Sequence, residues 1–201
     1  MFITFEGIDG CGKTTQVKYL KNFFLEKGYN VITTREPGST ILSEQIREIL
    51  LNSKYAISPI TELFLFNAAR MHLIDTVIIP ALKNNDIVIS DRFFDSTTAY
   101  QGFGHNTSIK DINQCNDIIK KYSITPNITF FLDISIEEFI KRRKNTKKDR
   151  IEALDTNFFK KVIEGYHYIA KQEPKRIKII DANNDIETTF KQIEQYILHI
   201  I

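Results

Sequence analysis

The chain has 201 residues, of which 42% are apolar and 26% are charged, and its formal net charge is +2. This composition indicates an ordinary globular protein, most simply a single domain over residues 1–201 with a sizeable core. The small net charge excludes a global field that would favour DNA or an anionic membrane, so we expect neither partner. No stretch reaches 18 consecutive apolar residues, the length that would predict a membrane-spanning helix.

The two cysteines and the N-terminus bear on localisation. Cys11 and Cys115 have no metal-ligand spacing, and unpaired thiols are typical of reducing compartments. The chain begins directly with a predicted strand and shows no basic segment or cleavage site of the kind found in signal peptides. We therefore expect a cytoplasmic protein.

The first fifteen residues carry the strongest motif. Residues 2–5 predict a buried strand, and helical spacing of apolar residues begins at Val17. Between them lies Gly7-x-x-x-x-Gly12-Lys13-Thr14, which in this context is the pattern of a phosphate-binding P-loop. Glycines let backbone N–H groups converge on phosphate oxygens, and the helix N-terminus adds a positive dipole. Lys13 can reach the β- and γ-phosphates, and the Thr14 hydroxyl can ligate Mg²⁺. The alternative, a strand-to-helix turn that merely contains glycines, is disfavoured by the complete match.

The remaining elements alternate between helix and strand. Apolar spacing predicts strands over residues 30–34, 86–90, 128–133 and 177–181, and helices over residues 14–27, 43–51, 61–82, 109–122, 136–143, 158–170 and 186–200. Gly28 is placed to end the first helix, and Thr61 is the expected N-cap of the third. Five strands alternating with helices predict an α/β fold of the P-loop NTPase type: a doubly wound, five-stranded parallel sheet with helices on both faces.

Polar residues follow two of the strands at their carboxyl ends, where ligands bind in open α/β sheets. Arg35 precedes a turn at Pro37-Gly38 and could meet an anion, although a surface pair with Glu36 or a nearby carboxylate is the alternative. Asp91 closes an apolar strand and is placed to hold Mg²⁺ directly or through water. Arg92 could clamp a phosphate, and an Asp–Arg surface pair is again the alternative.

Three later segments could complete a nucleotide site. Phe66 and Arg70 are four residues apart on a predicted helix, so they emerge on one face and could stack and bind a base, unless Phe66 is plain core. Residues 93–104 are polar and aromatic, which suits recognition of a base edge. Seven of the ten residues 141–150 are cationic, which indicates a mobile lid over polyphosphate, a solvated helix end or a nucleic-acid patch.

Taken together and in this order, the motifs resemble the thymidylate kinase (dTMP kinase) family over nearly the whole chain. The matching segments are Phe5-Glu-Gly-Ile-Asp-Gly-Cys-Gly-Lys-Thr-Thr-Gln16, Arg35-Glu-Pro-Gly38, Thr61-Glu-Leu, Ala68-Ala-Arg70, Asp91-Arg92, Ser96-Thr97, Ala99-Tyr-Gln-Gly102, Asp149-Arg-Ile-Glu152, Gly165-Tyr166 and Ile180-Asp-Ala182. The family transfers the γ-phosphoryl group of ATP to dTMP with Mg²⁺, making dTDP for dTTP synthesis, and is usually homodimeric.

The resemblance implies a role for each matching residue. ATP would be held by Gly7, Ile8, Asp9, Gly10, Cys11, Gly12, Lys13, Thr14 and Thr15, and the metal by Thr14 and Asp91. The dTMP site would contain Asp9, Arg35, Pro37, Phe66, Arg70, Arg92, Thr97, Tyr100 and Gln101. In that site Arg35 and Arg92 contact the acceptor phosphate, Phe66 stacks on thymine, Arg70 reads the base, and Thr97 and Gln101 lie over the base and sugar. The catalytic set would be Asp9, Lys13, Arg35, Arg92 and Arg143.

Arg143 is chosen because family members place one catalytic arginine either in the P-loop or in the lid. Positions 8–11 are Ile-Asp-Gly-Cys and contain no arginine. The lid, about residues 141–151, should then supply it. Arg142 and Arg150 remain the alternatives.

Two positions depart from the family pattern. Ser39 stands where the family often has glycine, which indicates that the backbone there need not adopt a positive φ. Cys11 stands where alanine or serine is common. Because a helix N-terminus lowers a thiol pKa, we hypothesise that Cys11 is reactive and that its alkylation inactivates the protein.

Other functions compete with dTMP phosphorylation. Another nucleoside monophosphate kinase would share most of these motifs. A P-loop GTPase or ATPase switch is a different class, and the sequence lacks an Asn-Lys-x-Asp guanine motif. A nucleic-acid module using the basic run lacks neighbouring aromatic residues and global positive charge.

Overall fold

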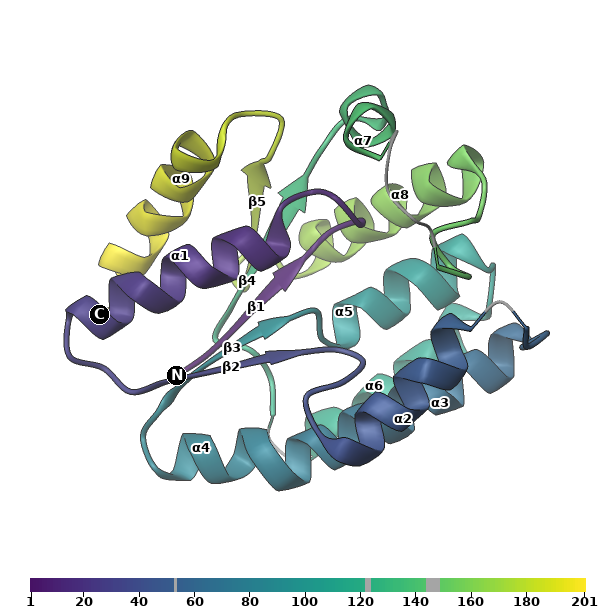
Figure 1. The fold of residues 1–201 in the computed structure, drawn as a ribbon, viewed down its shortest axis with the longest axis horizontal. Coiled ribbons are helices and arrows are strands. Elements are labelled where there is room, and N and C mark those ends of the chain that lie inside the picture. Colours follow the sequence, from purple (N-terminus) through teal and green to yellow (C-terminus); the bar gives the residue numbers. More distant parts are fainter. Residues whose placement is uncertain (53, 122–123, 144–148) are drawn as a thin grey trace.

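Five parallel strands form the centre of the molecule. The structure, a computed structural model, describes residues 1–52, 54–121, 124–143 and 149–201. The strands are β1 (Phe2–Glu6), β2 (Val31–Arg35), β3 (Ile87–Asp91), β4 (Ile128–Asp133) and β5 (Ile177–Asp181), in the sheet order β2-β3-β1-β4-β5 (Figure 1). The predicted five-stranded parallel α/β sheet is confirmed, and the predicted strands lie within one residue of the observed ones.

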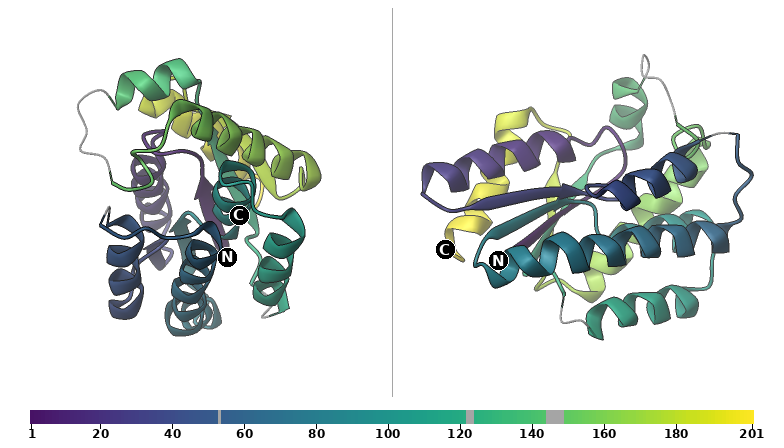
Figure 2. Two further views of the ribbon diagram at one scale, coloured as in Figure 1. Left: turned by 90° about the vertical axis from the view of Figure 1, so that its right-hand side faces the viewer. Right: turned by 60° about the horizontal axis from the view of Figure 1, so that its bottom comes forward.

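Helices cover both faces of this sheet (Figure 2). They are α1 (Lys13–Glu26), α2 (Ile41–Leu51), α3 (Pro59–Leu73), α4 (Ile79–Lys83), α5 (Phe94–Thr97), α6 (Ile109–Lys121), α7 (Ile136–Arg142), α8 (Thr156–Gln172) and α9 (Ile186–Leu198), with π-helical turns η1 (Ile74–Ile78) and η2 (Thr98–Gly104). Helices α1 and α9 pack together on one face, while α4 and α8 pack on the other.

Side-chain alternation explains why both faces are covered. Ile3 and Phe5 of β1 point into the core beneath α1, whereas Phe2, which precedes Ile3, packs into a second cluster with α4. In β4, Phe130 contacts Phe5 and Tyr196 of α9, while Phe131 stacks on Tyr166 of α8. A central strand buried on both faces must be apolar at nearly every position, which is the continuous run seen in the sequence.

The long apolar run between β2 and β3 differs in detail from its prediction. Helix α3 begins at Pro59, and its N-cap is Ser58, whose hydroxyl accepts the Thr61 N–H, so the expected Thr61 cap is wrong. Residues 59–83 are continuously helical but include the η1 turn. By length and mean hydropathy (1.3) this run could cross a bilayer, yet it packs on α2 and buries Glu62 and Arg70 in the fold.

The turn after β2 also differs from its prediction. Ser39 has φ 69°, so the interpretation that a positive φ is not needed at this position is wrong. Its hydroxyl accepts the Arg35 N–H at 2.8 Å, and its own N–H donates to Glu44 Oε1 at 2.8 Å. These local bonds offset the cost of a left-handed serine. By contrast, Gly28 ends α1 with φ 82°, as predicted.

The sheet order places β1 between β3 and β4. The connection after β1 runs to β2 on one side of the sheet, and the connection after β4 runs to β5 on the other side. A crevice therefore opens at the carboxyl end of β1. The loop following β1 is the P-loop of the sequence. Both termini lie at the opposite end of the molecule (Figure 1).

Candidate active site

The P-loop is folded for close approach of its backbone to a ligand. Gly7 has φ 138°, and a Cβ added there would lie 2.6 Å from the Leu132 carbonyl oxygen, so only glycine fits. Gly12 adopts φ 103° at the N-cap of α1. The Lys13 ammonium donates to the carbonyls of Gly7 (3.2 Å) and Ile8 (3.0 Å), which holds the cation inside the loop.

Thr14 and Asp91 form the expected metal-side pair. The Thr14 hydroxyl donates to Asp91 Oδ2 at 2.7 Å, because the parallel register of β1 and β3 sets Phe5 opposite Asp91. No group of three or more His, Cys, Asp and Glu side chains that could cage a metal occurs among the described residues. A hydroxyl beside one carboxylate suits Mg²⁺, which keeps several waters and shares its ligands with substrate phosphates.

Arg92 lies at the centre of the site. Its guanidinium donates to the Gly7 carbonyl (2.8 Å), Asp9 Oδ1 (2.8 Å) and the Tyr100 hydroxyl (3.0 Å). Its backbone has φ 73°, a strained conformation for a long side chain and one that clusters at functional sites. Burial alone would raise the pKa of Asp9, but Arg92 and Lys13 lower that pKa well below its usual range. Asp9 is therefore ionised, and its charge is matched by cations.

Two adjoining cavities meet at Asp9 and Arg92. The cleft on the P-loop side is lined by Asp9, Gly10, Gly12, Lys13, Thr14, Thr15, Arg35, Glu36, Arg47, Asp91 and Arg92. The second, called here the acceptor cavity, is lined by Asp9, Glu36, Pro37, Arg47, Leu51, Phe66, Arg70, Arg92, Ser96, Thr97, Tyr100, Gln101, Asp149 and Ile151. The structure thus brings together every residue expected in the dTMP site; Arg35 is the one that lines only the cleft.

Arg70 and Phe66 face the acceptor cavity from one side of α3. Arg70 is 2% exposed and pairs with Glu36 Oε2 at 2.6 Å. It also donates to Asn67 Oδ1 (3.2 Å), Thr97 Oγ1 (2.8 Å) and the Phe93 carbonyl (3.2 Å). The guanidinium is thus fixed from several sides, so it presents its remaining N–H in one direction.

Arg35 is less enclosed than the other expected phosphate ligands. Its guanidinium pairs with Glu44 at 3.0 Å, and the side chain is 56% exposed. This is the pairing with a nearby carboxylate that the sequence left open. It does not remove Arg35 from the site, because the side chain still lines the cleft beside Lys13 and Arg92.

The three lid arginines point in different directions. Arg143 is buried, donates to the Glu152 carbonyl (2.8 Å) and stacks over Phe139. Arg142 donates to the Gly10 and Ala182 carbonyls. Arg150 donates to the Leu50 carbonyl (2.7 Å) and to Glu62. Residues 144–148 of the predicted lid lie outside the described residues.

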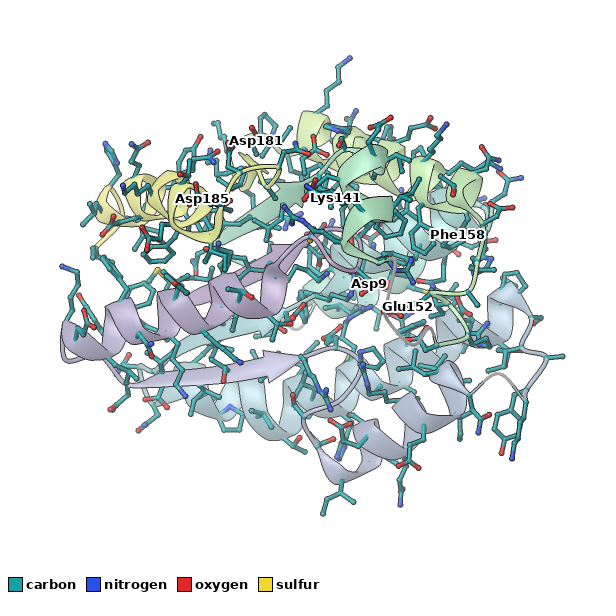
Figure 3. The ribbon with its side chains drawn as sticks, turned by 45° about the horizontal axis from the view of Figure 1, so that its top comes forward. Asp9, Lys141, Glu152, Phe158, Asp181 and Asp185 are labelled. Carbon is teal, nitrogen blue, oxygen red and sulfur yellow. The ribbon has the colours of Figure 1, made fainter. Side chains whose placement is uncertain are left out.

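A third cavity adjoins the P-loop where α7 approaches the loop before α9. It is lined by Gly10, Cys11, Gly12, Thr15, Gln16, Glu138, Arg142, Ala182, Asn183, Asn184, Asp185, Ile186 and Thr189. In the view of Figure 3, Asp181 and Asp185 lie at the two ends of this loop, and Asp9 and Glu152 lie below Lys141 of α7. This cavity continues the phosphate cleft on the side away from the acceptor cavity.

Comparisons with known proteins agree with this geometry. The sequence model of the family described as thymidylate kinase matches residues 5–193. Thymidylate kinases of Thermoanaerobacter sp. (strain X514) and Prochlorococcus marinus (strain AS9601) are 43% and 46% identical, covering 96% and 98% of this chain and 94% and 95% of theirs. The crystal structure of thymidylate kinase from Ehrlichia chaffeensis superposes with a TM-score of 0.81 at 36% identity, covering 98% of both chains.

The chain belongs to the thymidylate kinase family. It is therefore a nucleoside monophosphate kinase, and its reaction is the phosphorylation of dTMP. The resemblance drawn from the motifs is confirmed, and the switch and nucleic-acid alternatives fall away.

Several residues of this thymidylate kinase site escaped prediction. Arg47 of α2 lines both the cleft and the acceptor cavity and donates to the Pro37 carbonyl at 2.8 Å. Ile151 closes the acceptor cavity and is buried. Arg47 sits in a helix with an ordinary amphipathic pattern, and only the fold shows that its side chain lines these two cavities. Glu152 pairs with Arg143, and the matching motif around it was the only signal.

The hypothesis of a low-pKa Cys11 is wrong. The thiol is buried, and burial raises its pKa despite the nearby cations of Lys13 and Arg92. Its Sγ also lies 2.8 Å from the position of a Cβ added at Gly7, so it fills space beneath the loop. Burial raises a thiol pKa and a helix N-terminus lowers it, and at Cys11 the effect of burial is the larger.

Beneath Arg92 lies a second carboxylate that the sequence did not single out. Glu6 is fully buried; its Oε1 accepts the Phe93 N–H (2.8 Å) and its Oε2 accepts the hydroxyls of Ser96 (2.6 Å) and Tyr166 (2.9 Å). Those two hydroxyls each lie 3.2 Å from the Arg92 guanidinium. Burial, with the charge of Asp95, raises the pKa of Glu6 to about 7.

This raised pKa predicts a pH-dependent stability. The folded state holds the Glu6 proton more tightly than the unfolded chain does. The contribution of this proton to the free energy of unfolding is therefore full at low pH and is lost as pH rises through about 7. The free energy of unfolding of the wild type, minus that of Glu6→Gln, should fall by about 3 kcal/mol between about pH 4 and pH 8. Urea titrations measure this difference. The matched variant Glu26→Gln, on the exposed side of α1, should give a flat difference, and a flat result for Glu6→Gln would contradict the prediction.

Proposed function

We propose that the phosphoryl donor is ATP with Mg²⁺ and that the product, dTDP, feeds dTTP synthesis. One observation carries this proposal: the P-loop cleft and the acceptor cavity share Asp9 and Arg92. A donor phosphate held by the P-loop and an acceptor phosphate held by Arg92 would meet there in line. Phosphoryl transfer needs mainly this positioning and charge neutralisation.

Each cation has a place in this arrangement. Lys13 and the P-loop N–H groups bind the donor phosphates, and Thr14 with Asp91 holds the metal site. When bound, Mg²⁺ neutralises charge on the transferring group. Arg92 binds the acceptor phosphate, with Arg35 and Arg47 beside it in the cleft.

Arg143 is proposed as the lid arginine that stabilises the transferring phosphoryl group. It acts electrostatically on Asp9 and packs beside Gly10, where an added Cβ would lie 3.7 Å from its Cγ. Arg142 lines the third cavity and Arg150 is bound to Glu62. The third cavity is proposed as the site of the donor base.

The acceptor base would lie between Phe66 and the polar groups of Arg70, Thr97 and Gln101. Tyr100 and Pro37 would bound the sugar and phosphate. A flat aromatic ring supplies stacking, and the polar groups read the base edge.

A coupled ADP-release assay tests this function. With ATP and Mg²⁺, kcat/KM should be highest for dTMP among dTMP, dUMP, AMP, CMP and GMP, and EDTA should abolish turnover. A preference for AMP, CMP or GMP would indicate a different monophosphate kinase, and activity with GTP but not ATP would contradict the proposed donor.

Arg92→Ala should affect the acceptor far more than the donor. We expect kcat/KM for dTMP to fall by ~10³-fold, because a phosphate-binding arginine stabilises the transition state, while ATP affinity measured by calorimetry changes little. Arg92→Lys should recover only part of the loss, since lysine lacks the planar fork. Equal losses for both substrates would count against this assignment.

We further propose a cytoplasmic homodimer of single-domain subunits. Supporting the dimer, apolar side chains of the packed helices α2 and α3 face solvent: Ile41 (86% exposed), Leu42, Ile49, Ile60 and Phe64 (62%). A face of this kind usually marks an interface. A second copy of the chain would cover it with the same residues, as an isologous dimer requires. Both cysteines are free, which fits a reducing compartment.

A charge placed on this face should separate the subunits. Phe64→Glu should convert a dimer of 23.4 kDa chains into monomers in light scattering after gel filtration, because burying an unpaired carboxylate is costly. Leu25→Glu, at an exposed apolar position of α1, is the matched control and should remain dimeric. A wild type that runs as a monomer would overturn the proposal.

A further inference from the structure

Glu62, on the first turn of α3, is a buried carboxylate for which the phosphoryl transfer gives no role. It is 1% exposed. Its Oε1 accepts the side-chain N–H of Gln101 at 2.8 Å and lies 3.2 Å from His105 Nε2. Its Oε2 accepts from the Arg150 guanidinium. Burying a carboxylate is costly unless donors surround it, and here donors reach both oxygens.

The contact with Gln101 determines which way that amide faces. An amide has one donor end and one acceptor end, and an ionised carboxylate only accepts. The Nε2 end of Gln101 must therefore face Glu62. Gln101 is 2% exposed and lines the acceptor cavity, and no described residue donates to its Oε1. The carbonyl end is thus left for a ligand.

Glu62 remains ionised in spite of its burial. Burial raises its pKa, but the hydrogen bonds from Arg150 and Gln101, together with the neighbouring His105, outweigh burial, and the pKa is lowered. A neutral carboxylic acid could donate to the Gln101 carbonyl and reverse the amide. The surrounding donors exclude that state near neutral pH.

The acceptor cavity therefore presents one hydrogen-bond donor and one acceptor, in fixed positions, to the edge of a base. Arg70 supplies an N–H donor, and Gln101 supplies a carbonyl acceptor. The O4 and N3–H of thymine and uracil complement this pattern. Cytosine presents an amino donor and an unprotonated N3 at the same positions, so two donors would face each other, as would two acceptors.

We propose that Glu62 is a positioning residue that orients the Gln101 amide and so selects pyrimidines bearing an N3–H over cytosine. This rests on the proposed function, because it takes the acceptor cavity as the base site. Glu62 does not touch the substrate. Its effect passes through one hydrogen bond to Gln101.

The variant Glu62→Gln tests this role with little change in shape. A glutamine at position 62 can accept or donate, so it no longer imposes one orientation on Gln101. The ratio of kcat/KM for dTMP to that for dCMP should fall by ~10-fold or more, the cost of one mispaired buried group. The KM for ATP should stay within about twofold of the wild type, because ATP binds outside this cavity.

The control is Glu44→Gln, which changes a carboxylate to an amide next to Arg35. It should alter dTMP and dCMP equally, because both carry the same phosphate. An unchanged ratio in Glu62→Gln would overturn the proposal. Equal loss of activity with both nucleotides would also overturn it, since that is the result of a merely structural role.

A substrate analogue tests the same contact in the wild type, should Glu62→Gln fail to fold. In N3-methyl-dTMP the N3–H donor is replaced by N–CH3, while both ring carbonyls are kept. We expect its affinity in calorimetry to be ~10–100-fold weaker than that of dTMP, the cost of leaving the Gln101 carbonyl unpaired. Equal affinities would overturn the proposal. A wild type that binds neither nucleotide would instead overturn the proposed function, and this inference with it.

Discussion

The guanidinium of Arg92 is the interaction on which the rest of the site depends. It connects the P-loop carbonyl of Gly7, the carboxylate of Asp9 and the hydroxyl of Tyr100. A backbone at φ 73° presents the side chain in this direction, and such strain persists only where neighbours hold it. The Glu6 carboxylate does so by accepting the next backbone N–H, at Phe93. Backbone strain, burial and charge are thus concentrated at Arg92, where we propose that the donor and acceptor phosphates meet.

In the acceptor cavity, two side chains that face the ligand are each oriented by a buried carboxylate. Glu36 fixes Arg70, and Glu62 fixes Gln101. These partners are carboxylates at full or nearly full burial. A buried carboxylate is expensive, so its presence beside a ligand-facing group indicates that orientation, and not only contact, matters there.

The fold and the ligand-facing residues could largely be predicted from the sequence, for different reasons. Strand runs and the Gly7–Thr14 spacing are local signals, so they predict β1, the P-loop and the sheet class without tertiary information. Helical spacing indicated Phe66 and Arg70 but could not separate Phe66 from core, and only the family resemblance gave Arg70 and Gln101 their roles. Ser39 was mispredicted because its left-handed turn is supported by Glu44, a partner five residues later.

The residues that sequence reasoning missed share a property. Glu6, Arg47 and Glu62 act through contacts made only after folding, and each occupies an ordinary position in its own helix or strand. The pKa of Cys11 could not be predicted from the sequence for the same reason. The sequence shows that Cys11 lies near a helix N-terminus, but the burial that raises its pKa arises only in the complete fold.

The contacts of Arg92 have a consequence for the order of events in folding. Its bonds to Gly7 and Asp9 span 85 and 83 positions of the chain, and the Glu6–Tyr166 bond spans 160. Loop closures of this length form late, because their entropy is recovered only when β1 has paired with both β3 and β4. Helix α1 is held by local hydrogen bonds, so we expect it to form before the acceptor site. The contacts that support Arg92 thus join residues that span most of the chain.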